Sequence, residues 1–140
     1  MLARSSWWRS AAWPDPNEPE YRNGVAFVET AMPPHAVLEA LSSIEQAFAR
    51  KRIARNAPRT LDLDLIAHGR QVIDTPGLVV PHPRAHERRF VMGPLAELAP
   101  GWVHPVLGRT AAELAARAAV GRDAAPIIIP ARPREGGDPS

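Results

Sequence analysis

The 140-residue sequence contains no cysteine. Disulfide scaffolds, thiolate zinc sites and cysteine nucleophiles are therefore excluded. The sequence also lacks an uninterrupted apolar stretch near the ~20 residues that span a bilayer. Its first residues have neither the apolar region nor the small-residue cleavage site of a secretory signal. These absences predict a cytoplasmic protein that uses hydroxyl, carboxylate, imidazole and guanidinium chemistry.

Lysine is almost absent as well, since Lys51 is the only one among 17 basic residues. The net charge is +2 and the pI is about 9.9. Arginine forms paired hydrogen bonds with phosphate or carboxylate, so this bias suits an anionic ligand. GC-rich coding explains the same bias equally well. The phosphate-binding pattern G-x-x-x-x-G-K is missing, so side chains and metal ions must hold any nucleotide.

Length and composition indicate one globular domain, because 45% of the residues are hydrophobic and 23% are charged. The chain alternates strand-like and helix-like patterns. Prolines in residues 13–23 predict an irregular loop. Strands are expected over residues 24–30, 59–66 and 78–81, and a turn into a short strand over 69–74. Helices are expected over 35–54, 84–98 and 110–120, the last capped by Thr110 and Glu113. We expect a folded domain over residues 1–125 and a disordered tail over 126–140.

Asp62 and Asp64 flank Leu63 in the stretch R-T-L-D-L-D-L-I. On a strand, residues two apart face the same way at roughly 6.5–7 Å, so two carboxylates lie side by side. Their repulsion is relieved by a divalent cation, and Mg²⁺ is commonly held by one or two carboxylates together with phosphates and water. The alternative is a solvent-facing strand with incidental acidic residues.

Arginines gather on both sides of this acidic pair along the chain. They are Arg50, Arg52, Arg55, Arg59, Arg84, Arg88 and Arg89. Metal ions and guanidinium groups together neutralise charge in phosphoryl transfer. Two alternatives stay open: a basic end of a solvated helix, and a nucleic-acid surface with tryptophans as stacking platforms. The acidic pair argues against the nucleic-acid surface.

His82 lies in the stretch V-V-P-H-P-R-A-H-E-R-R-F. His86 follows four residues later, a spacing that can bind zinc on a helix. Pro81 and Pro83 keep His82 off a regular helix, so we interpret it as a loop imidazole that contacts an anion or orients a neighbour.

The two stretches A-P-R-T-L-D-L-D-L-I and V-V-P-H-P-R-A-H-E-R-R-F-V-M-G-P-L-A-E-L-A-P, in this order and spacing, resemble the hydroxymethyldihydropterin pyrophosphokinase family of folate biosynthesis. The upstream stretches S-S-W-W-R-S and P-E-Y-R-N-G-V-A-F-V-E-T resemble the family's second strand, pterin loop and third strand. The resemblance runs from about Ser5 to Val106. It implies an α+β fold, a ferredoxin-like sandwich of an antiparallel sheet and helices.

The resemblance implies transfer of pyrophosphate from ATP to the hydroxymethyl group of a reduced pterin, with AMP as the second product and two Mg²⁺ ions as cofactors. The implied metal ligands are Asp62 and Asp64, which with Arg50 and Arg52 of a flexible loop form the catalytic set. The implied ATP contacts are Glu45, Arg59, His82 and Arg88. The implied pterin contacts are Trp13, Tyr21, Asn23 and Phe90. ATP and the pterin are the expected partners, with neither nucleic acid nor membrane.

The sequence departs from the family pattern in two regions. Asn56 stands where many relatives carry a stacking tryptophan, and Pro83 replaces an aromatic residue of some members. The family also begins with a strand, a glycine-serine-asparagine loop and a helix, none of which is found before Ser5, so we expect an N-terminally truncated fold. An inactive fragment of the enzyme and a basic nucleic-acid-binding module are the alternative functions.

Overall fold

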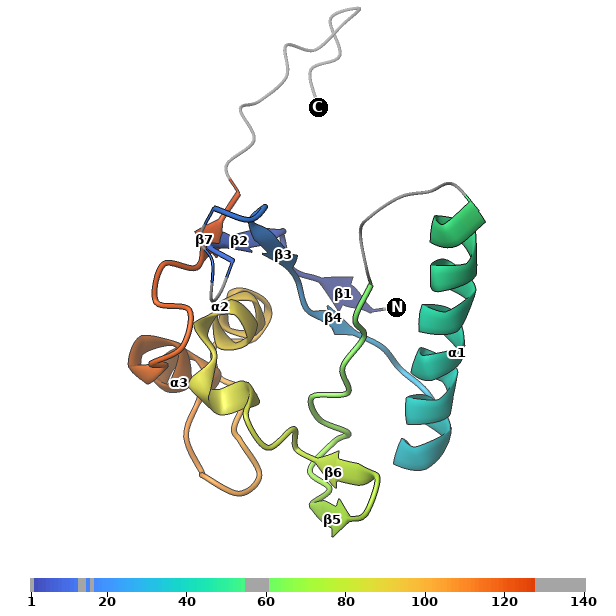
Figure 1. Cartoon of the computed structure of the whole chain (residues 1–140). Helices are drawn as coiled ribbons and strands as arrows, with labels where there is room; N and C mark the ends of the chain where they lie inside the picture. Colours follow the sequence, from blue (N-terminus) through green and yellow to red (C-terminus); the bar gives the residue numbers. More distant parts are fainter. Residues whose placement is uncertain (1, 13–14, 16, 55–60, 128–140) are drawn as a thin grey trace, which may run out of the picture.

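The computed structural model describes residues 2–12, 15, 17–54 and 61–127, and for residues 52–54 it describes the backbone alone. It confirms a mixed α+β architecture with antiparallel strand pairing (Figure 1). The helices of the described chain are α1 (Pro34–Ala54), the 3-10 turn η1 (Ala85–Glu87), α2 (Arg89–Leu98) and α3 (Ala111–Arg117). Its strands are β1 (Ala3–Arg4), β2 (Trp8–Ser10), β3 (Tyr21–Asn23), β4 (Ala26–Phe27), β5 (Ile73–Thr75), β6 (Leu78–Val80) and β7 (Ala125–Pro126). None of the helices in these ranges is long and apolar enough to cross a membrane.

The described strands form three small antiparallel sheets. β1 pairs with β4, β5 pairs with β6, and β2 lies between β3 and β7. In β2, Trp8 and Ser10 are buried and Arg9 is exposed, which is the alternation of a strand with one covered face. Helix α2 packs on that face, with Gly93 directly against the Trp8 ring.

Two predicted strands differ from the structure. The strand over residues 24–30 is reduced to β4, and residues 21–23, expected in an irregular loop, form β3. Residues 61–66 are not in a strand, although half-buried leucines still alternate with exposed aspartates there. Period-two patterning determines which side chains face inward. A strand also needs a neighbouring backbone to pair with, and the pattern does not specify one.

Helix α1 confirms the predicted helix and begins at Pro34, one residue earlier than expected. Proline is favoured in a first turn, where its missing N–H would have no partner in the helix. The apolar stripe of α1 is only partly covered, because Leu38 and Leu41 are half-buried and Ile44 is 52% exposed. The helix stands at one side of the molecule and contacts β6 (Figure 1). Its stripe is therefore not part of the buried core cluster of the described residues.

The helix predicted over residues 84–98 is divided at Arg88, which has an extended backbone. The residues around this break pair with a distant part of the chain. Val120 N–H donates to the Glu87 carbonyl at 3.0 Å, and Arg89 N–H donates to the Val120 carbonyl at 2.8 Å. These long-range bonds outweigh the local helical preference at Arg88.

Helix α3 begins as predicted with a capping box. The Thr110 hydroxyl accepts from the Glu113 N–H, and the Glu113 carboxylate accepts from the Thr110 N–H. The helix ends at Arg117, before the predicted Val120. Helices α2 and α3 and the turn η1 enclose the core, whose buried members are Ala85, Met92, Leu95, Ala111, Leu114 and Ala115.

The tail predicted from Pro126 onward begins too early. Pro126 belongs to β7, opposite Trp8 of β2, and Ile127 N–H donates to the Trp7 carbonyl at 2.9 Å. Edge strands tolerate proline because its missing donor can face away from the partner strand. The rest of the predicted tail lies outside the described residues.

A buried histidine organises the loop between α2 and α3. His104 is 5% exposed, and its Nδ1 accepts the N–H groups of Val106 and Leu107, each at 3.1 Å. The His86 ring lies edge-on to it, with the ring centroids 5.6 Å apart. Burial lowers the pKa of His104, and the nearby charge of His86 lowers it further. The neutral ring is therefore the form that stabilises the loop.

We expect acid to destabilise the protein through His104. Because its folded-state pKa lies below the ordinary value of 6.5, the unfolded chain takes up the proton first. Its contribution is complete above pH 6.5 and is lost as the pH falls from 6.5 toward the folded-state pKa. Urea unfolding across this window should show a shallower loss of stability for His104→Asn, whose side-chain oxygen can still accept the two N–H groups.

The control for this measurement is His82→Asn, because burial also lowers the pKa of His82 and the same window contains its contribution. Unfolding curves of the wild type, the two variants and the double variant separate the two histidines. If His104→Asn follows the wild-type pH dependence, the assignment to His104 is wrong.

Candidate functional site

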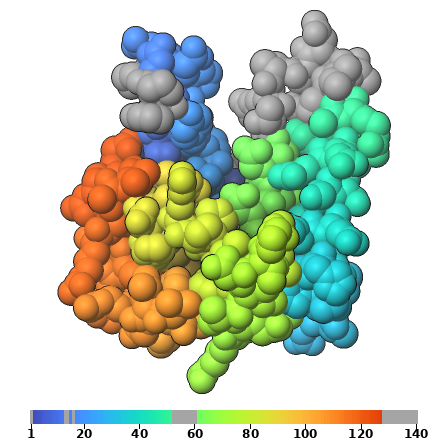
Figure 2. All heavy atoms as spheres, turned by 60° about the horizontal axis from the view of Figure 1, so that its bottom comes forward, coloured from blue at the N-terminus to red at the C-terminus, as the bar shows by residue number. Residues whose placement is uncertain are grey.

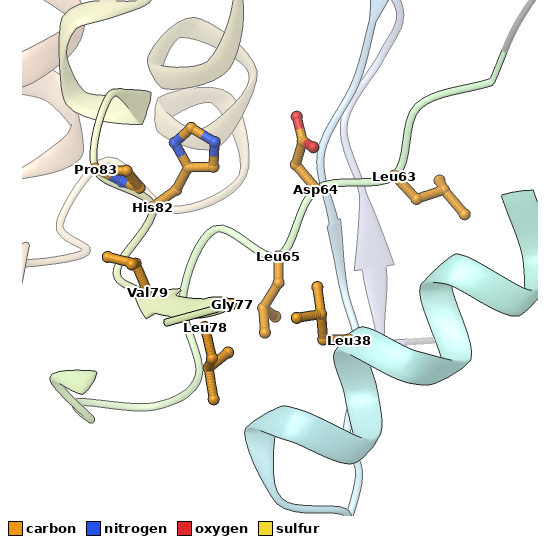
Figure 3. Close-up of a pocket in the computed structure, with 9 residues that line it drawn as sticks. All are labelled: Leu38, Leu63, Asp64, Leu65, Gly77, Leu78, Val79, His82 and Pro83. Carbon is orange, nitrogen blue, oxygen red and sulfur yellow. The ribbon is translucent and has the colours of Figure 1, made fainter. Parts of the chain in front are cut away.

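The acidic stretch and the proline-flanked histidine meet in the folded chain. The backbone N–H of His82 donates to the Ile66 carbonyl at 2.8 Å, which joins the two stretches directly. A pocket of about 290 Å³ opens beside this contact (Figure 3). It is lined by Leu38, Leu63, Asp64, Leu65, Gly77, Leu78, Val79, His82 and Pro83. In the space-filling view, residues 61–80 lie between α1 on one side and α2 and α3 on the other (Figure 2).

The pocket has a polar end and an apolar end. The Asp64 carboxylate and the His82 ring lie together at one end, and Leu38, Leu65 and Leu78 lie at the other (Figure 3). Leu38 comes from α1 and Leu78 from β6, so the pocket exists only when these two elements pack together. Such a pocket suits a ligand that combines an apolar ring with a charged group.

Hydrogen bonding determines which nitrogen of His82 carries a proton. Its Nδ1 accepts a hydrogen bond from the backbone N–H of Arg84 at 3.1 Å, so the neutral ring carries its proton on Nε2. Burial lowers the pKa of His82, Asp64 opposes this effect, and the positive charges of Arg88 and Arg84 reinforce it. One carboxylate and two guanidiniums are thus close enough to influence this imidazole.

Asp62 and Asp64 are both exposed, on the side of their segment opposite the half-buried leucines. This placement agrees with the alternation predicted from sequence, although no strand forms. Glu45 lies close to the same segment. Its Oε2 accepts the Leu63 N–H at 2.5 Å, so the carboxylate predicted to contact ATP contacts the protein's own backbone here.

The predicted arginines are distributed unevenly. Arg88 is half-buried between η1 and α2, with its guanidinium carbon 5.8 Å from the centre of the Phe90 ring. Arg50 is exposed near the end of α1, and Arg52 also lies in α1, not on a loop after it. Arg59 lies outside the described residues.

The residues predicted to bind the pterin come from two elements that contact each other. Tyr21 and Asn23 are in β3, which pairs with β2 and packs against α2. Phe90 is in the first turn of α2, half-buried, with its ring against Gly121. Trp13 lies outside the described residues.

Sequence reasoning missed the pocket walls and Arg84. Leu38, Leu65 and Leu78 belong to patterns that indicate core positions, because an apolar pocket wall and an apolar core have the same sequence signal. Arg84 was noted only as one of a run of arginines, and its N–H bond to His82 follows from a turn that the sequence does not specify.

The fold and the pocket define the class of this protein: a small α+β domain whose pocket combines a carboxylate and an imidazole with leucine walls. The family model described as 7,8-dihydro-6-hydroxymethylpterin-pyrophosphokinase (HPPK) matches residues 1–100. The chain belongs to this family.

The relatives named 2-amino-4-hydroxy-6-hydroxymethyldihydropteridine pyrophosphokinase include the following three. The one from Synechocystis sp. is 44% identical over 110 residues, which cover 79% of this chain and 56% of the relative. Those from Methylorubrum extorquens and Haemophilus influenzae are 40% and 37% identical over 84% and 75% of this chain, and 73% and 66% of their own lengths. The chain thus spans little more than half of the Synechocystis relative.

Proposed function

We propose that the chain transfers pyrophosphate from ATP to the hydroxymethyl group of 6-hydroxymethyl-7,8-dihydropterin, giving the pterin diphosphate and AMP. The family model and the names of the relatives support this reaction. The observation that carries the proposal is the pocket in which Asp64 and His82 form a polar end beside leucines. We also propose that the small sheets and the helices belong to the ferredoxin-like arrangement that the resemblance implies.

The apolar end of the pocket suits the adenine of ATP, and the polar end suits its phosphates. Leu38, Leu65 and Leu78 offer aliphatic surface to a flat ring. The neutral His82 can donate from Nε2 to a phosphate oxygen, and the Arg88 guanidinium can form paired hydrogen bonds. The chain thus orients the triphosphate with its reacting end toward Asp62 and Asp64.

The donor set fits Mg²⁺. Asp62 and Asp64 supply exposed hard oxygens, and no group of three or more metal-ligating side chains occurs within the ranges that the structure describes. Two carboxylates with phosphates and water match the coordination that Mg²⁺ prefers. We propose that Asp62 and Asp64 hold two Mg²⁺ ions, which when bound neutralise charge on the transferring phosphates.

The pterin is proposed to lie near α2 and β3. Phe90 offers a ring face for stacking, and Asn23 offers an amide that can pair with the polar edge of the pterin. The hydroxymethyl oxygen is a weak nucleophile, so the main task of the chain is to align it with the β-phosphorus. The proposed ligand contacts also include Trp13, Tyr21, Arg50, Arg52 and Arg59. Glu45 borders the nucleotide site through its contact with Leu63.

The test is AMP release by the purified 140-residue chain with ATP, Mg²⁺ and the pterin, set against the same mixture without the pterin. Pterin-dependent AMP formation that stops on chelation of Mg²⁺ is the expected result. A chain that binds Mg·ATP but releases no AMP is the inactive form of the family, which contradicts the proposed catalysis. Binding of DNA or RNA without Mg²⁺, and with a steep salt dependence, would support the nucleic-acid alternative.

A further inference from the structure

Within the part of the chain that the structure describes, few hydrogen bonds hold the acidic segment in position. Across residues 61–65, the Leu63 N–H makes the one hydrogen bond to another described residue, and its acceptor is Glu45 Oε2 at 2.5 Å. The next anchor is the Ile66 carbonyl, which accepts from His82. Because residues 61–66 are not in a strand, no ladder of backbone bonds holds them there.

Glu45 is placed on α1 for this contact. It follows Leu38 by two helical turns, so both residues project from the same side of the helix. Leu38 lines the pocket, and the Leu63 side chain forms part of the same wall near α1 (Figure 3). One carboxylate thereby links the helix to the segment, and both contribute walls of the pocket.

Leu63 is the residue between the two proposed metal ligands. A hydrogen bond on its amide therefore restrains the backbone on both sides, toward Asp62 and toward Asp64. Metal sites lose affinity when the groups that orient their ligands are removed, commonly by about 10-fold to 100-fold. We propose that Glu45 is a positioning residue that anchors the Asp62–Asp64 segment to α1, a role that rests on the proposed function of this site.

Two conservative variants of Glu45 separate the effect of side-chain length from the effect of charge. Glu45→Gln keeps the length of the side chain and an oxygen that accepts from the Leu63 N–H, but removes the charge. Glu45→Asp keeps the charge but is one methylene shorter, so it loses the bond. The matched control is Glu39→Asp, an exposed position on the same helix.

The first measurement is residue-resolved hydrogen exchange of the Leu63 amide by NMR, without nucleotide or metal. We expect exchange about tenfold faster in Glu45→Asp, and rates within about threefold of wild type in Glu45→Gln and Glu39→Asp. Residues 89–117 serve as the internal reference for an intact fold. Unchanged exchange in Glu45→Asp, or equally fast exchange in Glu45→Gln, overturns the anchoring role.

The second measurement is the calorimetric affinity for a non-hydrolysable ATP analogue, with Mg²⁺ and with chelator. We expect Glu45→Asp to weaken the affinity measured with Mg²⁺ about tenfold and to leave the affinity measured with chelator nearly unchanged. Glu45→Gln should bind the analogue as the wild type does. Glu45→Gln as weak as Glu45→Asp would mean that the charge contacts the ligand directly, which overturns the proposal. A wild type that binds no Mg·nucleotide contradicts the proposed function, whereas the exchange result still decides the anchoring contact.

Discussion

Asp62→Asn and Asp64→Asn are each expected to lower pterin-dependent AMP formation about a thousandfold, the effect of losing several kcal/mol of charge stabilisation in the transition state. Asparagine keeps the size of aspartate and one oxygen, but it supplies no negative charge to a cation. Both side chains are exposed, and the loss of either negative charge relieves their mutual repulsion. The free energy of unfolding should therefore change by no more than about 0.5 kcal/mol.

Turnover at saturating substrates and the thermal midpoint are measured on the same preparations. Asp74→Asn is the matched control, because Asp74 is an exposed aspartate on β5 that does not line the pocket. Near-normal turnover in both Asp62→Asn and Asp64→Asn would show that the metal assignment is wrong. Lost turnover accompanied by a large fall in the thermal midpoint would assign the pair a structural role instead.

Gly93→Ala is expected to destabilise the protein by about 1–3 kcal/mol through overpacking, even though alanine favours a helix by about 1 kcal/mol over glycine. A Cβ at position 93 would lie 2.6 Å from Cη2 of Trp8. The Trp8 ring cannot easily withdraw. It is 7% exposed, its Nε1 donates to Glu97 Oε1 at 3.1 Å, and the Arg89 guanidinium lies 5.9 Å from the ring centre.

Urea unfolding measures this effect, with Gly101→Ala as the control. A Cβ at position 101 would meet nothing within 4 Å, so this variant should stay within about 0.5 kcal/mol of wild type. Combining Gly93→Ala with Trp8→Phe should recover part of the loss, because the smaller ring leaves room for the methyl group. A Gly93→Ala protein as stable as wild type would contradict the close packing of α2 on β2.

The helices illustrate what periodicity can predict. The stripe along residues 35–54 and the cap formed by Thr110 and Glu113 are local features, and both are present as α1 and the start of α3. The break at Arg88 was not predicted, because its cause is pairing with Val120, far along the chain. The strands were harder to predict for the same reason, since each depends on a partner backbone that a single-sequence pattern does not identify.

Part of the candidate site could likewise be predicted from the sequence, and part depended on tertiary structure. The sequence by itself determined the side chains that can do chemistry, because the acidic pair, the proline-flanked histidine and the arginines are recognisable from residue type and spacing. Tertiary structure decided that Asp64 and His82 share one pocket, that leucines from α1, residues 61–66 and β6 form its walls, and that Glu45 holds Leu63. Residue type limits what a side chain can bind, whereas the packing of distant elements determines which side chains meet.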